Sequence, residues 1–325
     1  MATTEIKPSF APPLDGPETT ILDPDGDLHL LVGPERHVVI VCSRSLRRTS
    51  AVWKTMLFGN FAEAKSKAGE EWVIRLPDDR SEPALAVLAI IHNRFDLVPA
   101  IPTAMELYQI LVITEKYDMT EITRPWARQW IDYVQQTTRP ILAWIAWELG
   151  ESNIFNRAVD TLAVTCGLNE EGQLVTEKGA LLAQAKYDAL RPTDILEHIL
   201  TIRLDILGKM LSPLRNLVNN LKKSKSKCCK TCAMTNLGSL TISAADCNLD
   251  PLPMSASDYR GSVVELEEKF DKLSMVSSHD GPNSVDPLPA VRSLVKLAVE
   301  NRHHATPAFY LEHMESQRKK SGILV

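Results

Sequence analysis

The 325-residue chain has few cysteines and no long apolar segment. Six cysteines in a chain of this length do not provide the disulfide framework that holds small secreted domains together. The longest uninterrupted apolar run, residues 84–91, is far shorter than the roughly 18–20 residues that cross a bilayer. The chain also has no Asn-x-Ser/Thr glycosylation acceptor. We therefore expect no membrane-spanning segment and a reducing environment, either cytoplasmic or nuclear.

The sequence also lacks the common signatures of catalysis. It contains no glycine-rich dinucleotide-binding loop, no phosphate-binding Gly-Lys-Ser/Thr, no His-Glu-x-x-His helix and no Gly-x-Ser-x-Gly turn. His29, His37 and His92 are each explained as surface residues of strands or loops. We expect a protein that is not an enzyme and that has no cofactor.

The charge balance is mildly acidic, with 36 basic and 41 acidic residues and a net charge of −5. This balance argues against a nucleic-acid surface that covers the whole molecule. The densest basic segment, residues 222–230, fits a nuclear import signal or an anionic contact. It equally fits the solvated end of the preceding helix, where the helix dipole favours cations.

Residues 26–57 have the pattern of a hairpin followed by a helix. Residues 26–33 alternate apolar and polar side chains, Gly33 and Pro34 interrupt them, and residues 37–43 form a second apolar strand. The spacing then changes, because residues 43–57 place their apolar side chains three or four apart, as one face of a helix does.

Together with the segments that follow, these residues resemble the BTB/POZ domain, and in particular its fungal branch. The downstream segments resemble, in order, the third strand, the next helix, a crossing loop and the two closing helices of that domain: residues 70–79, 81–93, 91–99, 106–119 and 124–134. The resemblance implies an α+β fold over residues 23–136, in which a short sheet is capped by helices. Cys42 stands where animal members of the family usually have His.

The pattern beyond residue 136 is helical, with candidate helices at 141–150, 154–166, 181–190 and 193–221. This extension, residues 137–222, resembles the BACK segment that often follows a BTB domain. Leucines seven residues apart between 200 and 221 are typical of a leucine zipper. We favour a helix packed inside a domain, because Pro213 would kink a zipper and Arg203 would put a charge in its seam.

The two ends of the chain read as less regular. We expect residues 1–22 to be a disordered tail and residues 223–325 to be poorly ordered, with short helices such as one over 259–270 and a frayed end from Gln317 onward. Cys229 and Cys232 have the two-residue spacing of zinc ligands, and Cys247 follows later, but no fourth ligand lies nearby. Thiols in a poorly ordered linker are the alternative, and we expect no metal.

The resemblance implies that the protein works by binding other proteins. The family commonly forms a homodimer through its first strand and first long helix, and this helix has more apolar area than its own core needs, which makes five of its residues candidates for the interface: Leu46, Val52, Trp53, Met56 and Leu57. A second family role is adaptor for a cullin-type ubiquitin ligase, for which the candidate docking residues are Phe58, Phe95, Leu97, Tyr108 and Tyr117. The alternative function is a transcription-linked nuclear regulator that uses residues 222–230 for import or DNA contact. We assign Trp126 and Trp130 to core packing.

Overall fold

The computed structural model describes residues 18–64, 71–136, 140–182, 194–223, 229–276, 286–301 and 304–323. Within them the protein has a mixed α+β fold, with a four-stranded sheet, a two-stranded ribbon and twelve α-helices. The chain divides into two compact units. The first unit comprises Met1–Phe155 and Pro307–Val325, and the second comprises Asn156–Thr306. This division differs from the expected regions 23–136, 137–222 and 223–325, because the last helix belongs to the N-terminal unit.

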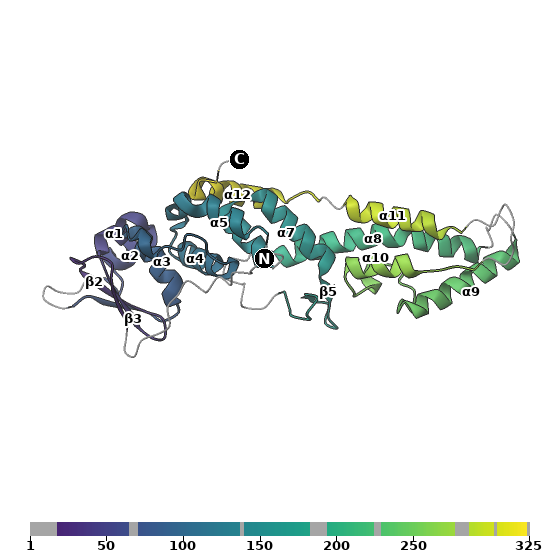
Figure 1. The fold of residues 1–325 in the computed structure, drawn as a ribbon, viewed down its shortest axis with the longest axis horizontal. Helices are drawn as coiled ribbons and strands as arrows, with labels where there is room; N and C mark the ends of the chain where they lie inside the picture. The colour runs from purple at the N-terminus through teal and green to yellow at the C-terminus, as the bar shows by residue number, and fades with distance from the viewer. Residues whose placement is uncertain are drawn as a thin grey trace, which may run out of the picture. The chain divides into compact units, whose positions relative to one another are not determined.

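The sheet of the first unit contains four short strands in the order β1-β3-β2-β4. Figure 1 labels its two central strands, β2 and β3. The strands are β1 (Thr19–Ile21), β2 (Leu28–Val32), β3 (His37–Val41) and β4 (Val73–Leu76). The predicted hairpin is confirmed, since β2 and β3 are antiparallel with Leu30 opposite Val39. β1 runs parallel to β3 and β4 runs parallel to β2. β1 lies inside the segment that we expected to be disordered, so that expectation is wrong from Thr19 onward.

The alternation of side chains explains why this sheet has one buried face. Leu28, Leu30 and Val32 are buried on β2, while the residues between them are only partly covered. Gly33 supports the turn between β2 and β3 with a φ of 77°, a backbone conformation that residues with a Cβ rarely adopt. Helix α3 (Ser81–Ile91) contacts β3.

The segment predicted as one helix over 43–57 forms two helices, α1 (Ser43–Thr49) and α2 (Ala51–Phe58). Ser50 interrupts them with an extended backbone. Its hydroxyl accepts a hydrogen bond from Trp53 N at 3.0 Å, which caps α2, and donates one to the carbonyl oxygen of Tyr117 at 2.5 Å. The break therefore comes from a tertiary hydrogen bond that periodicity does not reveal.

The described part of the first unit contains five further helices, and the last of them comes from the C-terminal end of the chain. They are α4 (Ala104–Lys116), α5 (Arg124–Val134), α6 (Ile141–Leu149), the start of α7 (Ser152–Thr165) and α12 (Ala308–Ser321), with 3-10 turns η1 (Phe95–Leu97) and η2 (Thr120–Thr123). Thr103 and Glu106 form a capping box at the start of α4. α4 packs on α3 and α6, and α6 packs on α12.

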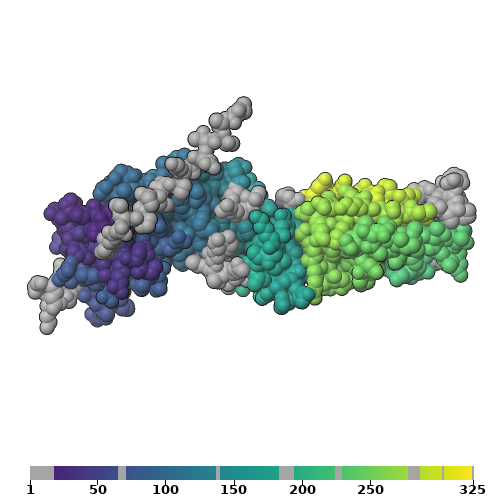
Figure 2. Space-filling view, turned by 60° about the horizontal axis from the view of Figure 1, so that its bottom comes forward, coloured from purple at the N-terminus to yellow at the C-terminus, as the bar shows by residue number. Residues whose placement is uncertain are grey.

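The second unit is built around one long helix, α8 (Ile195–Lys222), that contacts three other helices. The remaining elements are β5 (Gly167–Leu168), β6 (Leu174–Val175), α9 (Lys230–Asp246), η4 (Ala256–Asp258), α10 (Val263–Lys272) and α11 (Leu288–Glu300). Figure 2 shows α11, in yellow, lying directly against the green helices of this unit. The expectation that residues 223–325 are poorly ordered is therefore wrong for their described part. Most of the helix predicted at 181–190 lies outside the described residues.

Arg203 explains why α8 is a core helix and not half of a zipper. Its side chain is fully buried, and its guanidinium donates to the carbonyl oxygens of Cys166 at 3.3 Å, Tyr259 at 3.0 Å and Gly261 at 2.5 Å. Burial lowers the pKa of this guanidinium. Arg203 therefore holds α8 against two loops of its own unit by hydrogen bonds. Pro213 lies inside α8, which continues to Lys222.

Among the residues that the structure describes, no helix combines the length and the apolar character needed to cross a bilayer.

The predicted packing role of Trp130 leads to a stability test. Trp130 is fully buried, and its indole Nε1 donates to the carbonyl oxygen of Pro99 at 3.0 Å. We expect Trp130→Ala to lower the free energy of unfolding of the first unit by about 3–5 kcal/mol, because it leaves a large cavity. Urea denaturation followed by circular dichroism measures this change.

Tyr133→Ala is the matched control, since Tyr133 lies on the same helix but is exposed. An unfolding midpoint for Trp130→Ala equal to that of Tyr133→Ala would contradict the assignment. Trp126, the second tryptophan assigned to packing, is only partly covered and stacks on Trp130 with ring centroids 5.9 Å apart.

Candidate functional site

The structure places three of the five predicted dimer residues in the core. Leu46, Trp53 and Leu57 are buried, so the expectation that they supply interface area is wrong. The reason is that the inner face of α2 is used inside the unit, where the ring of Trp53 stacks on the ring of Tyr117 with centroids 4.6 Å apart. Val52 is exposed, and Met56 is half-buried.

The predicted docking residues divide in the same way. Tyr108 and Tyr117 are buried, which removes them from any partner surface, and the Tyr117 hydroxyl donates to Asp79 Oδ2 at 2.5 Å. Phe58 and Phe95 are exposed, and Leu97 is half-buried. These residues were predicted from their place in the resemblance, which does not reveal which side chains point outward.

The cysteine spacing does not produce a zinc site in the part of the chain that the structure describes. Cys229 caps the start of α9, and Cys247 follows its last residue. A helix of 17 residues is about 25 Å long, so Cys247 cannot share an ion with Cys229 and Cys232. The described residues include no group of three or more metal-ligating side chains. In the lysine-rich segment, residues 224–228 lie outside the described residues.

The three histidines of the sheet region have structural contacts. His37 is buried, not a surface residue as expected, and its Nε2 lies 2.9 Å from Thr20 Oγ1. His92 Nε2 accepts the backbone N–H of Cys42 at 3.0 Å, which holds α3 next to the start of α1. His29 Nδ1 lies 2.5 Å from Glu71 Oε1.

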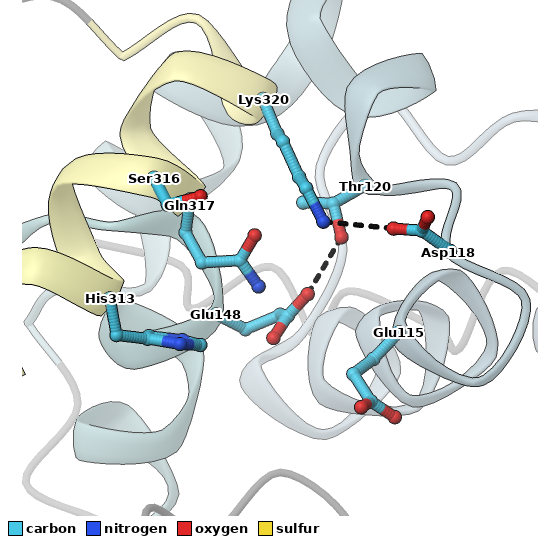
Figure 3. Close-up of a pocket in the computed structure, with 8 residues that line it drawn as sticks. All are labelled: Glu115, Asp118, Thr120, Glu148, His313, Ser316, Gln317 and Lys320. Atoms are coloured by element: carbon cyan, nitrogen blue, oxygen red, sulfur yellow. Dashed lines mark hydrogen bonds and ion pairs between the residues drawn. The ribbon is translucent and has the colours of Figure 1, made fainter.

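A polar pocket lies within the first unit, between α12 and the elements on which it packs (Figure 3). Its volume is about 210 Å³. Residues of the last helix supply one wall, and residues from the end of α4, from η2 and from α6 supply the other. The lining residues are Glu115, Asp118, Thr120, Glu148, His313, Ser316, Gln317 and Lys320.

Helix α12 forms its wall because His313, Ser316, Gln317 and Lys320 are three or four residues apart and so share one face. This face is held down by several contacts from its end. Lys320 Nζ lies 2.8 Å from Asp118 Oδ1, and the Ser321 hydroxyl donates to the carbonyl oxygen of Leu149 at 2.7 Å. On α5, Arg124 Nε donates to the carbonyl oxygen of Lys320 at 2.9 Å.

Gly150 permits this close approach. It ends α6 with a φ of 74°, and a Cβ built on it would lie 2.3 Å from the carbonyl oxygen of Met314 and from the backbone nitrogen of Arg318. Any other residue would therefore strain the backbone and also push α12 away. Beside this contact, the rings of Trp147 and His313 are stacked, with centroids 3.9 Å apart.

Glu148 is the least expected group in the pocket, because its carboxyl is almost fully buried on an apolar helix. Thr120 Oγ1 donates to Glu148 Oε1 at 2.7 Å. Burial raises the pKa of Glu148 to about 7, and hydrogen bonds from Thr120 and Gln317 oppose that rise. The carboxyl therefore changes its charge near neutral pH.

Two neighbouring groups in the pocket are also perturbed by burial. Burial raises the pKa of Glu115, with Lys320 lowering it and Asp118 raising it further. Burial lowers the pKa of His313, and the charge of Lys320 lowers it further, so the imidazole is held neutral. The pocket thus combines carboxylates with a neutral imidazole and one ammonium group.

The sequence does not predict this pocket. The frayed end expected from Gln317 onward is wrong, because α12 continues to Ser321 and Gln317 is buried. One signal in the sequence points to the site, namely a lone Glu148 in the otherwise apolar segment 141–149.

No known family model matches this chain, and no curated protein or solved structure is significantly similar to it.

The buried Glu148 predicts how stability depends on pH. Its pKa is about 7 in the folded protein, against an ordinary value of 4.5, so between these values the folded state binds more protons than the unfolded state. Stability therefore falls as pH rises from about 4.5 to about 7, by about 3 kcal/mol for this group. We expect Glu148→Gln to remove this loss and to stabilise the first unit at pH 8.

Tryptophan fluorescence during urea denaturation at about pH 5 and about pH 8 measures the effect on this unit, because all six tryptophans lie between residues 53 and 147. Glu312→Gln, a surface change on α12, is the control. If Glu148→Gln keeps the pH dependence of the unchanged protein, Glu148 does not titrate as described.

Proposed function

We propose that this chain is a non-enzymatic protein-protein interaction module whose N-terminal, BTB/POZ-like domain forms a homodimer. The observation that carries the proposal is apolar surface on and after α2. Three large apolar residues within ten positions are exposed: Val52 by 38%, Phe58 by 41% and Phe61 by 58%. Exposed single apolar residues are common, but α2 and its exit carry three large ones close together in sequence, which favours a contact surface there.

The ring of Phe58 is held in a fixed position, which suits an interface anchor. It meets the ring of Trp72 edge-on, with centroids 5.9 Å apart, and the guanidinium carbon of Arg47 lies 4.9 Å from its centroid. Because these neighbours already restrict the ring, a partner that covers Phe58 loses little additional side-chain entropy.

A second copy of this chain suits the surface because a two-fold axis presents the same apolar residues from both partners. Arg47 lies over Phe58, and Trp72 Nε1 donates a hydrogen bond to the carbonyl oxygen of Glu63 at 2.8 Å, so both rings of the pair are held by their own chain.

The dimer is tested by the mass of the full chain in solution. We expect sedimentation equilibrium at roughly 20 μM, well above the dissociation constants of stable dimers, to give 72.4 kDa, twice the chain mass of 36.2 kDa. Phe58→Asp should shift this mass toward 36.2 kDa, because it buries a charge in the interface.

Phe95→Asp is the matched control, since it makes the same change at another exposed phenylalanine of the same unit. A mass of 36.2 kDa for the unchanged protein would overturn the proposed dimer. Equal dissociation by both variants would show that Phe58 is not at the contact.

The exposed Phe95 favours a second role, that of an adaptor which docks a cullin-type scaffold. Phe95 lies on η1 and is 54% exposed, and its ring lies 5.6 Å from that of Trp126. Leu97 on the same turn is half-buried. This surface retains two of the five predicted docking residues and lies on a different element from α2.

Binding of a purified cullin N-terminal region to the full chain tests the adaptor role. We expect Phe95→Asp to weaken this binding roughly tenfold or more, as loss of an aromatic anchor does. Phe58→Asp should leave it unchanged. If the unchanged protein does not bind the cullin region, the adaptor role is wrong while the dimer stands.

A further inference from the structure

We propose that the pocket beneath α12 binds a small organic cation that carries N–H donors, such as an alkylammonium or guanidinium group. This site is independent of the surfaces on α2 and η1. All of its lining residues belong to the first unit, so it does not depend on the second.

Gln317 provides the evidence that the pocket is built for a ligand. Its side chain is only 6% exposed, and its amide points into the pocket beside Glu148 (Figure 3). The oxygen Oε1 is buried and accepts no hydrogen bond from any part of the chain that the structure describes. A buried acceptor without a donor is unfavourable, and a donor in the pocket would remove that cost.

His313 adds a second acceptor. Its Nε2 is also buried without a hydrogen-bond partner among the described residues. Burial and Lys320 keep the imidazole neutral, and in the tautomer protonated at Nδ1 the free Nε2 lone pair accepts a hydrogen bond. Because His313 and Gln317 both line the pocket, a ligand with several N–H donors could serve both acceptors.

The charges around the pocket select a cation. Three carboxyl groups line it, from Glu115, Asp118 and Glu148, against the single ammonium of Lys320. Lys320 is already paired with Asp118 at 2.8 Å. The carboxylates of Glu115 and Glu148 therefore remain to attract a positive charge, and both would repel an anion.

The size of the pocket limits the ligand. Its volume is about 210 Å³, which is room for a small molecule but not for a large one. A guanidinium or a short alkylammonium fits, and it would contact α12 on one side and α6 on the other. Such a ligand stabilises the docked position of α12 by mass action.

The affinity should depend on pH in a definite direction. Glu148 faces Glu115 and Asp118 from the end of α4, Thr120 from η2, and His313, Gln317 and Lys320 from α12. Its pKa of about 7 makes it mostly neutral at pH 6 and mostly ionised at pH 8. Because ionised Glu148 attracts a positive charge, a cation should bind more tightly at pH 8 than at pH 6. Any protonation of His313 at the lower pH would repel the cation and so act in the same direction.

The direct test is an NMR titration of the full chain with butylammonium chloride and with guanidinium chloride at millimolar concentration and constant ionic strength. We expect both cations to bind saturably at pH 8. Tetramethylammonium has the charge but no N–H donor, and butanol has no charge, so both should bind at least roughly tenfold more weakly.

Variants assign the binding to this pocket. Glu148→Gln should lower the affinity for butylammonium roughly tenfold at pH 8 and abolish its pH dependence, and Gln317→Leu should lower it to a similar extent. Glu115→Gln changes an exposed rim residue that a folded protein tolerates, and it should also weaken binding. Glu312→Gln removes the same charge from α12 outside the pocket and should have no effect.

Three outcomes would overturn the proposal. The first is a merely hydrated pocket, seen as the absence of saturable binding by butylammonium and guanidinium. The second is equal affinity for tetramethylammonium, which would indicate general charge attraction. The third is an equal loss of affinity in Glu312→Gln and Glu115→Gln, which would place the binding elsewhere.

Discussion

The first unit depends on the close contact between its last helix and the end of α6. Gly150 makes this contact, since its positive φ ends α6 and its missing Cβ leaves room for the backbone of α12. The contact brings residues more than 150 positions apart in sequence into one packed layer, where Trp147, Phe155 and Tyr310 meet ring to ring. Residues 156–306, which belong to the second unit, therefore lie in sequence between the two segments that make up the first unit.

The same contact buries a carboxyl group, that of Glu148, in an apolar part of this unit. Packing α12 on α6 removes Glu148 from water, and Thr120 and Gln317 compensate only in part for the lost hydration. A hydrophobic residue at this position would pack without that cost. Arg203 in the second unit differs in this respect, because its Nε and Nη2 donate to three backbone carbonyl oxygens, although its Nη1 has no partner among the described residues. Arg203 thus ties together segments of its own unit, whereas Glu148 lines a pocket.

Surface residues were harder to predict than core residues because the apolar side chains of α2 do not all face one way. Trp53 and Leu57 are four residues apart and point inward, whereas Val52, one position before Trp53, is exposed. The sequence of residues 43–57 indicated more apolar area than one helix needs for its own core. It did not indicate the break at Ser50, after which α2 starts with its own set of inward-facing residues. Tyr117 illustrates the same limit, since its ring is buried by stacking on Trp53 and its hydroxyl is held by Asp79.

Signals that lie within a few residues were enough to predict the β2–β3 hairpin with its turn at Gly33 and the long apolar face of α8. The sequence also favoured a core helix over a zipper for α8, because Arg203 would put a charge in the seam and Pro213 would kink it. Only the tertiary structure decided that the C-terminal helix joins the N-terminal unit, and that Glu148 and Gln317 share a pocket. Periodicity records which side of a helix is buried but not which distant segment covers it, since that choice depends on the fit of backbones such as those at Gly150 and Met314.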